Sequence, residues 1–248
     1  IFLFVKESHQ YDIALLCHAA STFLAVLFAN ILIYREGFRL IRPSLRLIKL
    51  TLGHSSQFFL SRLALSASSS LSVIVLSNNV APAQVGLYGA SERLYGAFKR
   101  LINPFSQALY PYMANTGNIK LLLRFVIIIA GIMFLPALIG FIFAEDVLRI
   151  IFGAEFIASK TILRIFIISG YVAFFSICFG YPAFAGLKRV DLANKSVIIS
   201  GSFQIFSLLI LLVSGQITPI TIACSILITE SITFLLRFLW FKDLIKKQ

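Results

Sequence analysis

Charged side chains are scarce in this chain of 248 residues, where Asp, Glu, Lys and Arg together make up 13%. A soluble domain averages about 25%, so the composition excludes an ordinary soluble globular fold. Hydrophobic residues make up 59% of the chain and the mean hydropathy is +0.93. Several apolar runs reach the roughly 20 residues that a helix needs to cross the hydrocarbon of a bilayer. The sequence therefore predicts an all-α polytopic membrane helix bundle.

Cysteine and histidine are also sparse, with three of each. Cys17, Cys178 and Cys224 lie inside apolar runs and have no neighbour at metal-ligand spacing, so we interpret them as small buried hydrophobes. The histidines do not cluster, and we expect neither a metal site nor a cofactor. The sequence also lacks a paired nucleophile and base, a glycine-rich phosphate loop and paired carboxylates, so we do not expect an enzyme.

The sequence also lacks long connections between its apolar runs, and this argues against some membrane enzymes. A membrane polysaccharide polymerase or ligase would carry its chemistry on a sizeable extramembrane loop, and no connection here is long enough to form one. The first residue is Ile1 rather than Met, and no signal-peptide pattern precedes the first apolar run. We therefore expect further spans upstream of this sequence.

About seven spans are predicted from the apolar runs. They cover approximately residues 11–34, 50–76, 85–114, a span ending near 144, residues 160–185, a span ending near 213, and residues 220–241.

Lys and Arg concentrate in the connections after the first, third, fifth and seventh spans, whereas the other connections are neutral or acidic. The positive-inside rule assigns the basic connections to the cytoplasm. A multi-pass protein with a cytoplasmic C-terminus follows. The formal net charge of +12 then reflects orientation and contact with anionic lipid rather than nucleic acid.

The segment 85–114 is long enough to span a bilayer, yet it carries charge in its middle. At about 100° per residue, its polar side chains form one stripe along a helix. The stripe consists of Tyr88, Glu92, Tyr95, Lys99, Asn103, Ser106 and Tyr110. A polar stripe at membrane depth must face protein or a water-filled cavity. We therefore predict that this helix forms one wall of a polar path.

Two cations are expected near the middle of the membrane, Lys99 in the third span and Arg62 in the second, with Ser66 on the same face as Arg62. They either form a cationic cavity that attracts an anionic group, or they pair internally, for example Lys99 with Glu92. Glu230 and Arg237 lie two turns apart on one face of the last span, and for them we expect a structural pair, either within that helix or with another helix. Glu92 and Glu230 are also candidates for binding a coupling ion.

The segment VGLYGASERLYGAFKRLINPFSQALYPYMA (residues 85–114) resembles the signature region of the polysaccharide flippases in the multidrug/oligosaccharidyl-lipid/polysaccharide exporter superfamily. The connector IFGAEF is similar to a short outward segment of that family. The stretches GLKRVDLANKSVIISG and SGQITPITIACSILITESI resemble its last two helices.

The resemblance implies two similar bundles around a central cavity, of which this chain would hold the second. Residues 1–34 would be the last helix of the first bundle, 35–49 a basic cytoplasmic linker, and 50–248 the second six-helix bundle. The family moves polyprenyl-pyrophosphate-linked oligosaccharide units across the bacterial cytoplasmic (inner) membrane by alternating access, for O-antigen and other surface polysaccharides. The implied partners are this substrate, membrane lipid and other polysaccharide-assembly membrane proteins.

The implied substrate gives the polar residues possible roles. Arg62 and Lys99 match cationic cavity positions that would face the pyrophosphate. The tyrosines of the stripe would contact sugar rings or serve as packing residues. The candidate substrate-binding residues are Arg62, Lys99, Glu92, Tyr95, Asn103, Tyr88 and Ser66.

The sequence argues against three other functions. A drug or cation antiporter of the same superfamily would favour acidic cavity residues, and a polysaccharide polymerase would need a larger loop. A retinal-binding seven-helix receptor would need a lysine in its last span, and residues 220–241 contain none.

Overall fold

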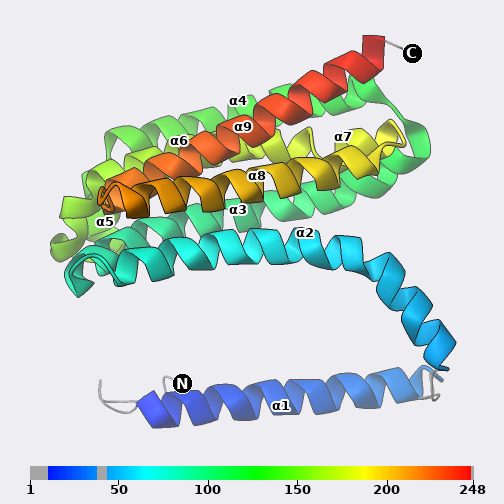
Figure 1. Cartoon of the computed structure of the whole chain (residues 1–248), viewed down its shortest axis with the longest axis horizontal. Coiled ribbons are helices and arrows are strands. Elements are labelled where there is room, and N and C mark those ends of the chain that lie inside the picture. Colours follow the sequence, from blue (N-terminus) through cyan, green and yellow to red (C-terminus); the bar gives the residue numbers. More distant parts are fainter. Residues whose placement is uncertain (1–10, 38–43, 247–248) are drawn as a thin grey trace. The chain divides into compact units, whose positions relative to one another are not determined.

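The computed structural model describes residues 11–37 and 44–246, apart from some side chains within 11–14 and 53–69. Every regular element in the described ranges is a helix (Figure 1), which confirms the all-α fold class. The chain divides into two compact units, Ile1–Leu52 and Gly53–Gln248.

The first unit contains α1 (Tyr11–Arg35) and the first turns of α2 (Leu45–Ser77). The second unit contains the rest of α2 and all later helices. These are α3 (Pro82–Thr116), α4 (Ile119–Ile142), α5 (Ala144–Ile151), the 3-10 helix η1 (Ala154–Ser159), α6 (Lys160–Cys178), α7 (Tyr181–Gly186), α8 (Val190–Val213) and α9 (Pro219–Lys246).

Five helical segments of the described part are long and apolar enough to cross a membrane. They are Leu15–Arg35, Ile119–Ile142, Ala154–Gly186, Val190–Val213 and Pro219–Lys246, and each lies on a predicted span. The remaining two predicted spans correspond to α2 and α3, which are helices of 33 and 35 residues. Helix α3 is too charged to meet the hydropathy criterion, although a helix of that length extends about 50 Å.

The turn between α3 and α4 follows from its sequence, NTGN. Gly117 adopts a left-handed conformation (φ 59°), and its N–H donates to the carbonyl of Met113. Asn118 then caps α4, because its side-chain oxygen accepts the N–H of Leu121 at 3.0 Å. Together these contacts satisfy backbone groups that the two helix ends leave without partners.

The predicted fifth span is interrupted rather than simply kinked at Pro182. Helix α6 ends at Cys178 and α7 begins at Tyr181, so Pro182 lies in the first turn of a new helix. Phe179 fills the break and packs its ring on Phe234, Phe238 and Phe241 of α9 at centroid distances of 5.1–6.1 Å. The break is therefore held against α9 by aromatic contacts.

Within the second unit, α6 lies at the centre of the packing. It contacts α3, α4 and α9, while α8 packs along α9 (Figure 1). Large apolar side chains lie on the outside of the unit, such as Ile127 of α4, which is 71% exposed. Polar side chains such as Gln204 and Arg237 are buried. This distribution is the reverse of a soluble protein and suits a bundle surrounded by lipid.

Candidate functional site: a polar cavity between the helices

A cavity of about 710 Å³ in the second unit is lined by residues of α2, α3 and α6 to α9. Its wall is formed mostly by polar side chains. They are Ser72, Glu92, Tyr95, Lys99, Asn103, Ser106, Gln107, Tyr110, Ser176, Tyr181, Ser200, Gln204, Thr229, Glu230, Thr233 and Arg237. Because the bundle is apolar on its outside, this cavity forms a polar region between the helices.

Helix α3 supplies one wall of the cavity with the stripe that the sequence indicated. Glu92, Tyr95, Lys99 and Asn103, which are four of the candidate binding residues, all line the cavity. They share a face because steps of three and four residues return to the same side of a helix. The structure thus brings these side chains together, and their role in binding substrate stays a prediction.

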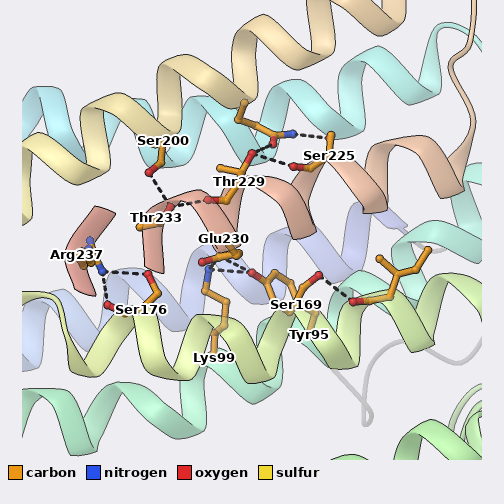
Figure 2. Close-up of polar contacts among 12 residues, drawn as sticks. Tyr95, Lys99, Ser169, Ser176, Ser200, Ser225, Thr229, Glu230, Thr233 and Arg237 are labelled. Atoms are coloured by element: carbon orange, nitrogen blue, oxygen red, sulfur yellow. Dashed lines mark hydrogen bonds and ion pairs between the residues drawn. The ribbon is translucent and has the colours of Figure 1, made fainter. Parts of the chain in front are cut away.

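Lys99 and Tyr95 both contact Glu230 of α9. The Lys99 ammonium lies 2.8 Å from Glu230 Oε1, and the Tyr95 hydroxyl donates to the same oxygen at 2.6 Å. In Figure 2 both side chains approach Glu230 from one side of α9, while Ser200 meets Thr233 on the other. Lys99 therefore pairs with a different helix, and not with Glu92 of its own helix.

Tyr88 does not line the cavity, which corrects its predicted place on the cavity wall. Its side chain is 0% exposed and packs edge-on against Phe166 of α6 with ring centroids 5.6 Å apart. The first turns of α3 lie close to α6, so the polar stripe is covered there. The Tyr88 hydroxyl has no hydrogen-bond partner among the described residues.

The side chains of Arg62 and Ser66 lie outside the described residues, so the cationic pair of Arg62 and Lys99 remains a prediction. Among the described side chains that line the cavity, Glu92 and Glu230 offset Lys99 and Arg237 in formal charge. Glu92 forms no ion pair with another described residue.

Glu230 thus forms an interhelical ion pair, which is one of the two arrangements predicted for it, whereas Arg237 forms no ion pair with a described residue. The Nε of Arg237 donates to Ser196 Oγ at 2.7 Å. Its Nη1 donates to the Ser176 carbonyl at 2.6 Å, as Figure 2 shows. The residue is 6% exposed. The guanidinium instead caps the interrupted end of α6, where Ser176 leaves a carbonyl without a helical partner.

Arg237 also belongs to a row of contacts between α8 and α9, here called the α8–α9 ladder. Its rungs are Ser196–Arg237, Ser200–Thr233 and Gln204–Thr229. Thr233 donates to Ser200 Oγ at 2.6 Å, and Thr229 donates to Gln204 Oε1 at 2.6 Å. Polar residues at every fourth position of both segments were the available sequence signal, because that spacing puts them on one helix face.

An exposed ion pair joins α5 to the first residue of α6, and its carboxylate lies between two spanning segments. Lys160 Nζ lies 2.5 Å from Glu145 Oε1, and both side chains are more than 40% exposed. The hydrogen bond from Lys160 and its charge lower the pKa of Glu145. Nearby, Arg164 donates its Nε–H to the carbonyl of Phe141 at 3.0 Å, at the end of α4.

The apolar exterior, the helices long enough to span a membrane and the polar cavity between them define a multi-pass helical membrane protein. Residues 1–117, which include α1, α2 and α3, match the family model described as "Polysaccharide biosynthesis protein". This match over the first 117 residues agrees with the resemblance of the segment 85–114 to a family of polysaccharide exporters. Comparisons with curated proteins and with solved structures give no match.

Proposed function

We propose that the chain takes part in moving polyprenyl-pyrophosphate-linked oligosaccharide units across the bacterial cytoplasmic membrane for surface polysaccharide synthesis. The observation that carries this proposal is the polar cavity of about 710 Å³ inside an apolar bundle. A saccharide headgroup is hydrophilic, so a polar compartment lowers the free energy of its passage through the hydrocarbon. The match to a polysaccharide biosynthesis family supports the same substrate class.

The cavity offers the groups that a saccharide requires. Hydroxyl and amide side chains such as Asn103, Ser106 and Gln107 lie along α3. Each can both donate and accept hydrogen bonds, as sugar hydroxyls also do. Tyr95 and Tyr110 add aromatic faces to the same wall. The apolar exterior is then left to the polyprenyl chain and membrane lipid.

The acidic side chain of Glu92 in the cavity supports one alternative function. Glu92 lines the cavity without an ion-pair partner among the described side chains, and an unpaired carboxylate suits a cationic ligand. A drug or cation antiporter of the same superfamily is therefore the second candidate.

Mass spectrometry of polyprenyl-linked saccharides in host membranes, with the gene intact and deleted, tests the proposal. Deletion is expected to accumulate complete repeat units on the cytoplasmic leaflet, where an impermeant glycosidase added outside does not reach them. Sensitivity to cationic drugs without such accumulation would favour the antiporter. Accumulation of single units on the outer leaflet would instead indicate a polymerase and contradict both transport functions.

A further inference from the structure

Arg237 is a buried cation that makes no ion-pair contact with a carboxylate of the described residues. Its side chain donates to Ser196 Oγ, to the Ser176 carbonyl and, at 3.4 Å, to Ser176 Oγ, all of which are neutral acceptors. No ion pair joins it to another residue of the described ranges. Glu230, the cavity carboxylate on the same helix, is seven residues away, about 10 Å along the axis, and binds Lys99.

One nitrogen of the guanidinium is open to the cavity. Nε and Nη1 make the hydrogen bonds given above, and Nη2 donates to no described residue. Within the described part of the chain, the fully enclosed polar side-chain atoms without a partner are the hydroxyls of Tyr88 and Ser91. Nη2 of Arg237 is not one of these fully buried atoms. It is therefore accessible from the cavity, whose wall includes Arg237.

The position of the guanidinium is fixed before any ligand arrives. It lies against the backbone at the α6–α7 break, where a Cβ added to Gly180 would come within 2.6 Å of Nη1 and 3.1 Å of Cζ. Only a glycine leaves this space. Because Ser196 and Ser176 hold the other two nitrogens, a ligand that reaches Nη2 meets a donor that is already oriented.

The surrounding wall is suited to an anion. Ser176, Tyr181, Ser200 and Thr233 line the same cavity and bring hydroxyl groups rather than carboxylates. Lys99, the other cavity cation among the described side chains, is already paired at 2.8 Å with Glu230. Among the described side chains that line the cavity, Arg237 is therefore the cation without a carboxylate in contact.

We propose that Arg237 is an anion-binding group of the cavity and takes a phosphate or pyrophosphate ester through its Nη2 edge. A guanidinium is always charged and presents planar N–H donors that match phosphate oxygens. The assignment to a lipid-linked pyrophosphate rests on the proposed function, whereas the anion site itself rests on the geometry of Arg237.

Binding of geranylgeranyl pyrophosphate to the full chain in phosphatidylcholine nanodiscs tests this site, with geranylgeraniol as the uncharged probe. Arg237→Gln is expected to weaken binding of the pyrophosphate by about 10-fold to 100-fold, the effect of losing a charge-assisted hydrogen bond. Binding of the alcohol is expected to stay unchanged. The matched control is Arg164→Gln, which removes an arginine that also donates to a helix-end carbonyl but does not line the cavity.

A second measurement needs no variant, because Arg237→Gln removes a cap of α6 and can impair folding. The wild-type chain is treated with phenylglyoxal, which modifies arginine, and the peptide that contains Arg237 is followed by mass spectrometry. The pyrophosphate probe is expected to slow its modification at least threefold, and the alcohol is not. Equal rates with and without the pyrophosphate would overturn the site.

Two further comparisons in the phenylglyoxal experiment distinguish the source of the phosphate. They also separate the test of the anion site from the test of the proposed function. Protection by phosphatidylglycerol nanodiscs alone would support an anion site but assign it to a membrane phospholipid. Protection by the prenyl probe in phosphatidylcholine supports the lipid-linked substrate. If neither protects Arg237 while gene deletion still accumulates lipid-linked saccharide, the anion site fails and the proposed function stands.

Discussion

At the residue scale, the two described cations of the cavity differ in how their charge is balanced. Lys99 is paired with a carboxylate and its side chain is 36% exposed, while that of its partner Glu230 is 16% exposed. Arg237 is bonded only to neutral oxygens. The first arrangement joins α3 to α9, and the second leaves a positive charge for a ligand. The two residues should therefore respond differently to mutation.

Breaking the Lys99–Glu230 pair is expected to destabilise the bundle because each single change leaves one charge without its partner. Glu230→Gln should lower the free energy of unfolding by about 1–2 kcal/mol, a modest value because Lys99 can still reach water. The double variant Lys99→Met/Glu230→Gln should lose less than the sum of the single changes. Unfolding of the purified protein in mixed micelles measures this coupling.

The exposed pair of Lys160 and Glu145 provides the comparison for that double-mutant cycle. Solvent screens it, so its coupling should be much smaller. A Lys99–Glu230 coupling no larger than that of the exposed pair would contradict a structural role for the contact between α3 and α9.

Gly180→Ala is expected to displace the Arg237 guanidinium, because the added Cβ would lie 2.6 Å from Nη1. The expected loss of stability is about 1–3 kcal/mol, as for other overpacked buried positions. Gly131→Ala in α4 is the matched control, since nothing lies within 4 Å of its added Cβ. That change should instead stabilise the helix by about 0.5–1 kcal/mol. If Gly180→Ala and Gly131→Ala changed the melting temperature equally, the close contact between Gly180 and the Arg237 guanidinium would be contradicted.

Sequence reasoning found the residues of the cavity where one helix determines their position. Glu92, Tyr95, Lys99 and Asn103 were predictable because helical periodicity alone places them on one face. Tyr88 has the same spacing but is covered, since it packs in a buried cluster with Leu76, Phe166 and Ile222 from three other helices. The contacts of Arg237 depend on a break in another helix, which the position of Pro182 suggested only within a few residues.

At the element scale, the interruption between α6 and α7 and the α8–α9 ladder meet at Arg237. The ladder joins α8 to α9 by side-chain hydrogen bonds, and such bonds contribute on average about 0.6 kcal/mol each inside membrane bundles. Phe179 and Arg237 then attach the break to α9 by aromatic and polar contacts respectively. Helix α9 is therefore the element that links the broken span to the cavity.

The junction of α5 and α6 predicts a pH dependence at the surface. The pKa of Glu145 is lowered from its ordinary value of 4.5, with the hydrogen bond from Lys160 as the main cause. The folded form therefore binds its proton less tightly than the unfolded form. The stabilisation is fully present above pH 4.5 and is lost as the pH falls through the lowered pKa.

Thermal unfolding of the wild type and of Lys160→Gln across pH 3 to 7 measures this effect. The wild type should have the higher melting temperature at neutral pH, and the difference should shrink below about pH 4, where the carboxylate takes up its proton. A difference that stays constant with pH would show that Lys160 acts through packing rather than through Glu145.

At the scale of the whole molecule, the segments between the helices of the second unit gather at its two ends (Figure 1). One end carries the basic residues around the starts of α4 and α8, including Lys120 and Lys188, and the other carries the acidic residues of α5. This separation agrees with the alternation of charge along the sequence. By the positive-inside rule, the basic end is expected in the cytoplasm.

Labelling of single cysteines with a membrane-impermeant maleimide in intact cells tests that orientation. In a background where Cys17, Cys178 and Cys224 are replaced by serine, Asn78→Cys should react from outside. Lys188→Cys should react only after the membrane is permeabilised. The opposite pattern would invert the topology without changing the fold.

The number of spans shows where sequence and structure agree at this scale. Five predicted spans also meet the criterion of length and apolarity within the described helices. Helix α3 was predictable as a span only from its length and its stripe, because Glu92, Arg93, Lys99 and Arg100 lower its hydropathy. Hydropathy alone cannot identify a helix whose charges face a cavity, since the criterion assumes lipid on all sides.

The Lys99–Glu230 pair also has a consequence for how the protein is made. Its two residues are 131 positions apart, so the ribosome completes α3 long before it completes α9. A lone lysine at the centre of a span is unfavourable by about 2.5–3.5 kcal/mol on insertion scales. Helix α3 is then expected to stay at the translocon or an insertase until α9, which carries Glu230, has been synthesised. A chain truncated at Ser214 should leave α3 poorly inserted and rapidly degraded, which a pulse–chase experiment with a glycosylation reporter would reveal.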